Sequence, residues 1–186
     1  MRSNEKEIFE ELNCKLADNN MSLEIICVGG FVLSHNNLRA TLDIDGFFKS
    51  NSIIDSIIRD VGNKFEINKA DELWLNNSVQ NLNSPPNKDI CDLLYNFSNL
   101  KVYIAPLDYV AGMKLISCRE QDILDVASII KAKAITDPIE LSNVLFSYGF
   151  ENIDESVLLE AFGRAYGMKW LESYYIEHED EILKKF

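Results

Sequence analysis

Two aspartates one residue apart, Asp43 and Asp45, are the residues of this sequence best suited to chemistry. Apolar and polar residues alternate from Leu42 to Gly46, which is typical of a β-strand. Side chains two apart on a strand point to the same face, so the two carboxylates would project together. Hard divalent ions such as Mg²⁺ bind carboxylate oxygens and keep positions open for phosphate. The pair therefore predicts metal-assisted phosphoryl or nucleotidyl transfer.

Two glycines, Gly29 and Gly30, supply what an acidic pair needs in order to hold a polyphosphate. They follow a strand-like apolar run over residues 24–28 and open a short helical segment. Glycines leave room for phosphates, and the first helical turn offers unpaired N–H groups. Taken singly, the acids have an ordinary interpretation as a solvated strand face, and the glycines as a turn. Their order, with Arg39 and Thr41 just ahead of the acids, favours a phosphate site.

The elements that must position these residues follow from the spacing of apolar side chains. Helical spacing predicts helices over residues 7–16, 52–61 and 89–97. Alternation predicts a further strand over residues 100–105, which Pro106 ends. The first half of the chain is therefore expected to combine a small sheet with helices on its faces.

The second half, from residue 107 onward, has helical periodicity throughout. Its clearest start signal is Asp137-Pro138-Ile139-Glu140, an N-cap acid followed by proline at the first helical position. We therefore predict the α/β (α+β) class. A small mixed sheet with flanking helices would occupy residues 1–105, and a C-terminal helical bundle, residues 106–186, would pack on it as one compact unit.

Composition and charge narrow the classes of function. The chain has 186 residues, 47% of them apolar, and 18 basic against 30 acidic residues give a net charge of −12. Such a protein repels nucleic acid except at a locally basic patch. Four scattered cysteines and two histidines, His35 and His178, argue against a Cys/His zinc site or a histidine-based triad. The apolar runs are too short for a membrane span and the N-terminus is polar, so we expect a cytoplasmic protein with no membrane partner.

Two groups of motifs together resemble a known family. The segment Val28-Gly29-Gly30-Phe31, followed by Arg39-x-Thr41-x-Asp43-Ile44-Asp45, resembles the signature of the nucleotidyltransferase superfamily, whose minimal fold is shared with polymerase beta. More narrowly, the chain is similar to the bacterial DUF6036 and AbiEii-type nucleotidyltransferase-like proteins. That similarity includes a later strand, residues 102–106, then Met113-Lys114-Leu115, Arg119 and Asp122-Ile123-Leu124-Asp125. The resemblance spans residues 24–130.

The resemblance implies a role for each matching residue. It assigns catalysis to Asp43, Asp45 and Asp122, with Mg²⁺ or Mn²⁺ on the first two. It assigns nucleotide binding to Gly29, Gly30, Arg39, Thr41, Lys114 and Arg119. Two of these assignments have structural alternatives. Lys114 could instead be an exposed lysine on a helix. Arg119 and Asp122 could instead form an ion pair on a helix surface.

One part of the superfamily pattern is missing. A third carboxylate, which in the wider superfamily lies on a later strand, is absent from residues 101–105, and Asp122, Asp108 or Glu66 are the replacements to consider. Two functions therefore stay open. One is an enzyme that transfers a nucleotidyl group from a nucleoside triphosphate to a hydroxyl of RNA or protein, for which the resemblance also suggests a toxin role with an antitoxin partner. The other is a catalytically degenerate binding protein. The sequence leaves the oligomeric state open.

Overall fold

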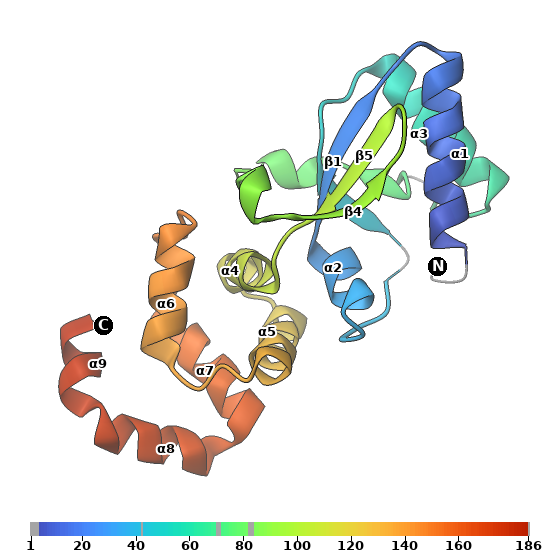
Figure 1. The fold of residues 1–186 in the computed structure, drawn as a ribbon. Coiled ribbons are helices and arrows are strands. Elements are labelled where there is room, and N and C mark those ends of the chain that lie inside the picture. The colour runs from blue at the N-terminus through green and yellow to red at the C-terminus, as the bar shows by residue number, and fades with distance from the viewer. Residues whose placement is uncertain (1–3, 42, 70–71, 82–83, 186) are drawn as a thin grey trace. The chain divides into compact units, whose positions relative to one another are not determined.

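A computed structural model of the chain describes residues 4–41, 43–69, 72–81 and 84–185, which form two compact units, Met1–Pro106 and Leu107–Phe186 (Figure 1). The first unit contains a five-stranded mixed sheet, and the described part of the second is helical. The predicted α+β class, a small mixed sheet with flanking helices followed by a helical bundle, is confirmed. Across the described residues, no helix has the length and apolarity needed to cross a membrane.

The sheet has the strand order β3-β2-β1-β5-β4. Its central strand β1 (Leu23–Val28) runs parallel to β5 (Leu100–Ile104) and antiparallel to β2 (Ile44–Phe47). On the far side of β2 lies the short parallel strand β3 (Leu75–Asn76), and β4 (Asp92–Asn96) forms the opposite edge. The strand predicted from residue 42 therefore begins at Ile44, and Leu42 lies outside the described residues.

Helices α1 (Glu5–Asp18) and α3 (Ser52–Lys64) lie side by side in the first unit, and α1 also packs on β5 (Figure 1). The apolar residues that predicted α1 are its buried face: Ile8, Phe9, Leu12 and Leu16. Helix α3 begins at Ser52, the first residue of the helix predicted over residues 52–61. Its N-cap is Asn51, whose side-chain oxygen accepts hydrogen bonds from the N–H groups of Ile53 and Ile54. Helix α1 therefore covers part of the sheet with its buried face, and α3 packs beside α1.

The helix predicted over residues 89–97 is wrong. A short 3₁₀ turn, η2 (Lys88–Ile90), leads instead into β4, which pairs antiparallel with β5. The apolar residues that suggested a helical stripe do not form a buried face, because Ile90 is 39% exposed and Leu93 is 48% exposed. A register shift between Leu93 and Tyr95 also breaks the strict alternation by which a strand is recognised. Pairing with a neighbouring strand outweighed the local helical pattern.

The second unit is formed by six helices in its described part: α4 (Leu107–Ser117), α5 (Glu120–Lys133), α6 (Pro138–Ser147), α7 (Glu155–Tyr166), α8 (Met168–Glu177) and α9 (Glu179–Lys185). Helix α5 packs against both α4 and α7 and buries Val126, Ile129 and Ile130. The predicted start of α6 is confirmed, because the Asp137 side chain caps that helix.

Asp137 links two helices of this unit and makes its stability depend on pH. Its Oδ1 accepts the N–H groups of Ile139 and Glu140 and, at 2.8 Å, the hydroxyl of Tyr174 in α8. Burial alone would raise the pKa of Asp137, but these hydrogen bonds outweigh burial and lower it. A lowered pKa in the folded state means that the carboxylate stabilises the protein above the unfolded-state pKa. That stabilisation disappears as the pH falls through the folded-state pKa.

We therefore expect Asp137→Ala to lower the free energy of unfolding by about 1–2 kcal/mol at pH 7, the usual cost of losing an N-cap together with a further hydrogen bond. The difference from wild type should shrink below about pH 4, where Asp is protonated in the unfolded chain. Urea unfolding between pH 7 and pH 3 measures this. The control is Asp137→Asn, which keeps a capping oxygen but does not titrate. A difference between Asp137→Ala and wild type that stays constant over this range would contradict the expectation.

Candidate active site

Gly29 lies directly against Asp45 because of the register between two strands. Val28, the last residue of β1, pairs with Asp45 of β2, and α2 (Gly29–His35) starts at the next residue. The backbone of Gly29 has φ +61°, and a Cβ atom built on it would lie 3.0 Å from Asp45 Oδ2. Any larger residue here would combine backbone strain with a close contact on the carboxylate. The glycine therefore lets the Asp45 carboxylate lie directly against the backbone at the start of α2.

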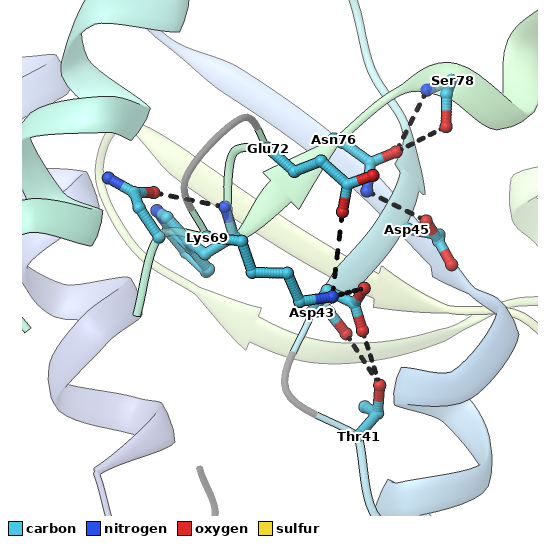
Figure 2. A network of polar contacts seen from close by, with 9 residues as sticks. Thr41, Asp43, Asp45, Lys69, Glu72, Asn76 and Ser78 are labelled. Carbon is cyan, nitrogen blue, oxygen red and sulfur yellow. Dashed lines mark hydrogen bonds and ion pairs between the residues drawn. The ribbon is translucent and has the colours of Figure 1, made fainter. Parts of the chain in front are cut away.

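Gly30 stands in the same relation to Thr41, which in turn contacts the other acid. A Cβ atom on Gly30 would lie 3.1 Å from Thr41 Oγ1. The Thr41 hydroxyl donates a hydrogen bond of 2.8 Å to Asp43 Oδ1 (Figure 2). Two glycines, a threonine and two aspartates predicted from the sequence are thus brought together at the end of β1. Asp43 itself precedes β2 rather than lying within it.

A lysine that the sequence analysis did not single out binds Asp43. Lys69 Nζ lies 2.8 Å from Asp43 Oδ2 and 3.8 Å from Glu72 Oε2 (Figure 2). The hydrogen bond from the Lys69 ammonium is the main reason that the pKa of Asp43 is lowered, and the same contact raises the pKa of Lys69. Asp43 is therefore ionised at neutral pH and already has a cationic partner.

Asp45 is held by a neighbouring strand. Asn76 of β3 pairs with it in the parallel register, and the Asn76 amide donates a hydrogen bond of 3.0 Å to Asp45 Oδ1. The side-chain oxygen of Asn76 accepts in turn from the backbone N–H and the hydroxyl of Ser78 (Figure 2). These bonds fix the amide so that its NH₂ group faces the carboxylate. Asp45 therefore has an orientation set by two strands and not by its own rotamer preference alone.

Both aspartates line one cavity of about 430 Å³. Two further carboxylates, Asp55 and Glu72, and one cation, Arg59, also line it. Its remaining lining residues are Phe48, Leu73, Leu75, Asn76, Asn77 and Ser78. Even with the Lys69 ammonium paired to Asp43, the four acids outnumber Arg59 and Lys69, so this cavity attracts cations.

The donor set of this cavity fits Mg²⁺. Its carboxylate oxygens are the hard ligands that Mg²⁺ and Mn²⁺ take. In the part of the chain that the structure describes, no three His, Cys, Asp or Glu side chains are grouped closely enough to hold a metal ion by themselves. Mg²⁺ characteristically binds through one or two carboxylates and completes its shell with water and substrate phosphates. Asp43 and Asp45 would hold it in that manner.

The other predicted site residues lie elsewhere in the chain. Arg39 is exposed in the segment after α2. Lys114, Arg119 and Asp122 belong to the second unit, and their part in the site stays a prediction. Lys114 is not an exposed helix lysine, because its side chain is only 12% exposed and its Nζ lies 2.5 Å from Asp122 and 2.8 Å from Asp125.

The neighbours of Lys114 form a largely buried ionic group. Burial alone would raise the pKa of Asp122, but the Lys114 ammonium outweighs burial and lowers it. Arg119 is more weakly engaged: its side chain is 80% exposed and its Nε lies 3.9 Å from Asp122. Of the other carboxylates considered as a third acid, Asp108 pairs with Lys133 and Glu66 is exposed.

Two of the residues that sequence reasoning missed, Lys69 and Asn76, lie far along the chain from the acids that they contact. Lys69 follows Asp43 by 26 residues, and Asn76 follows Asp45 by 31. Asp55 and Arg59 lie on α3, where they read as the polar face of an amphipathic helix. No local pattern marks any of these residues as part of a binding site. The contact of β3 with β2 is what brings Asn76 to the site.

Comparison with known proteins adds one finding. A family model described as a nucleotidyltransferase of unknown function (DUF6036) matches residues 4–148, which cover the whole sheet and the first three helices of the second unit. Neither curated proteins nor solved structures give a significant match.

Proposed function

Because this chain belongs to the DUF6036 family of nucleotidyltransferases, we propose that it transfers a nucleotidyl group from a nucleoside triphosphate to a hydroxyl of an RNA or protein acceptor, with Mg²⁺ or Mn²⁺ as cofactor. Asp43 and Asp45 are the proposed metal ligands, and the phosphates are proposed to lie beside Gly29 and Gly30.

The observation that carries this proposal is the convergence of the acids and the glycines. Asp43 and Asp45 line a single cavity, and Gly29 lies in contact with the Asp45 carboxylate. Carboxylates bind a cation, and a side-chain-free stretch of backbone admits a polyphosphate. Each feature alone has a structural explanation, but the two together combine a seat for a metal ion with open backbone for the phosphates.

The proposed reaction breaks one bond and forms one. The acceptor hydroxyl oxygen bonds to the α-phosphorus of the triphosphate, the bond from that phosphorus to the β-phosphate oxygen breaks, and pyrophosphate leaves. The hydroxyl proton passes to a base or to water. The metal would stabilise negative charge on the phosphates. The chain's own residues position the proposed metal ligands: Thr41 and Asn76 hold the carboxylates of Asp43 and Asp45 through hydrogen bonds.

One observation favours the alternative, a protein that binds a triphosphate without transferring its nucleotidyl group. Strand β5 (Leu100–Ile104) carries no carboxylate, whereas the superfamily pattern places a third acid on a late strand. Asp55 and Glu72 line the cavity with Asp43 and Asp45 and are our candidate replacements in the described part of the first unit.

Label transfer distinguishes the two functions. We expect incubation with one of the four α-³²P-labelled triphosphates, Mg²⁺ and either total RNA or total protein to label the acceptor, and EDTA to prevent it. Labelled RNA and labelled protein would identify the acceptor class. Saturable binding of a triphosphate with no transfer to either pool would overturn the enzymatic proposal and leave the binding function.

A further inference from the structure

We propose that the Lys69 ammonium occupies the cation position at Asp43, so that a divalent metal ion must displace it in order to bind. This inference rests on the proposed function, since it takes Asp43 to be a metal ligand. It assigns to Lys69 a role as a positioning residue that competes with the metal and sets its affinity.

Both oxygens of Asp43 are engaged. Thr41 donates to Oδ1 at 2.8 Å, and Lys69 lies 2.8 Å from Oδ2 (Figure 2). A metal ion bound to Oδ2 at the usual distance of about 2.1 Å would approach the ammonium closely, and the two cations would repel each other. The two are therefore alternative partners of one carboxylate.

The backbone that carries Lys69 is anchored to α3. Asn68 donates from its amide to the carbonyl of Arg59 and to Asn63 Oδ1, and its own oxygen accepts the N–H of Trp74. It packs so closely on α3 that a Cβ atom at Gly62 would lie 2.0 Å from Asn68 Oδ1. The residue before Lys69 is thus fixed on the helix, which limits the positions that the ammonium reaches.

Trp74 fixes the other side of this segment. Its side chain is 1% exposed, and its indole N–H donates 2.8 Å to the carbonyl of Ile58. Between the anchors, the N–H of Lys69 bonds to the carbonyl of Glu72. The backbone of Lys69 is therefore held on both sides, and its ammonium contacts Asp43 from this anchored segment. Glu72, 3.8 Å from the ammonium, offers a second acceptor when the metal takes Asp43.

Competition has a measurable consequence. Removing the ammonium should strengthen the binding of metal in the absence of nucleotide, because the metal then binds without breaking the ion pair between Lys69 and Asp43. The opposite expectation follows if Lys69 merely stabilises the loop: its removal would then leave metal affinity unchanged or weaken it through loss of order.

The test is a titration of the full chain with Mn²⁺, in which electron paramagnetic resonance measures free Mn²⁺. We expect Lys69→Met to bind Mn²⁺ about tenfold more tightly than wild type, within the usual range for coupled sites. Lys69→Arg keeps the charge and should resemble wild type. The matched control is Lys64→Met. The Lys64 side chain is 57% exposed and that of Lys69 is 50% exposed, and Lys64 forms a 2.7 Å ion pair with Glu11. Lys64→Met therefore also breaks an exposed ion pair, and it changes the net charge by the same amount.

The outcomes separate this inference from the proposed function. If wild type binds Mn²⁺ in a manner that depends on Asp43 and Asp45, but Lys69→Met binds no more tightly, the competition is overturned and the metal site stands. Equal tightening by Lys64→Met would also overturn it, because net charge would then be the cause. If neither wild type nor any variant binds Mn²⁺, both the proposed metal site and the competition by Lys69 are overturned. If Lys69→Met binds Mn²⁺ more tightly but wild type transfers no label, the competition is supported and the enzymatic function is overturned.

Discussion

Asp45→Asn is expected to reduce label transfer by about 10³-fold, because an amide in place of the carboxylate is a poor metal ligand and the metal supplies several kcal/mol of transition-state stabilisation. The fold should survive this change. Asparagine has the same shape as aspartate, and its side-chain oxygen still accepts the hydrogen bond from the Asn76 amide. Initial rates of label transfer at saturating Mg²⁺, with thermal unfolding as a check on folding, measure the effect.

Asp60→Asn is the matched control for this variant. Asp60 is an exposed residue of α3 outside the lining of the cavity, and its substitution changes the net charge by the same amount. We expect its transfer rate to stay within about twofold of wild type, as for most surface substitutions away from a site. A similar rate in Asp45→Asn and Asp60→Asn would show that Asp45 does not hold the metal.

Gly29→Ala should lower transfer by about 10²-fold, because a small displacement of a reacting group has an effect of this order. The added methyl group would lie 3.0 Å from Asp45 Oδ2 and force the carboxylate or the backbone to shift. The left-handed backbone at Gly29, with φ +61°, adds a destabilisation of about 1–2 kcal/mol for a residue with a Cβ. We therefore expect both a lower transfer rate and a lower melting temperature.

Gly149→Ala separates these two causes. Gly149 also has a positive φ, +89°, but a Cβ atom built on it meets nothing within 4 Å. Its substitution should therefore lower the melting temperature without the loss of transfer by the folded protein. Transfer that falls equally in Gly29→Ala and Gly149→Ala would mean that backbone strain, and not contact with the carboxylate, explains the loss.

The elements were predictable where one local pattern dominated. Helix α1 buries the very residues whose spacing indicated it, and α6 begins at Asp137 because that side chain caps its first turn. Strand β4 was not predictable in the same way. Its apolar residues happen to recur at helical spacing, and only the hydrogen bonds with β5 decide that the segment is extended.

The two acids, the two glycines and Thr41 could be predicted from the sequence as one group. Their separation along the chain is short, and β1 and β2, which are joined through α2, pair antiparallel and bring them together. The tertiary structure alone decided which side chains orient and neutralise these acids. Lys69 and Asn76 reach them from 26 and 31 residues away. Contacts of this kind depend on how α3 and β3 pack beside β2, and neither hydrophobic periodicity nor capping signals carry that information.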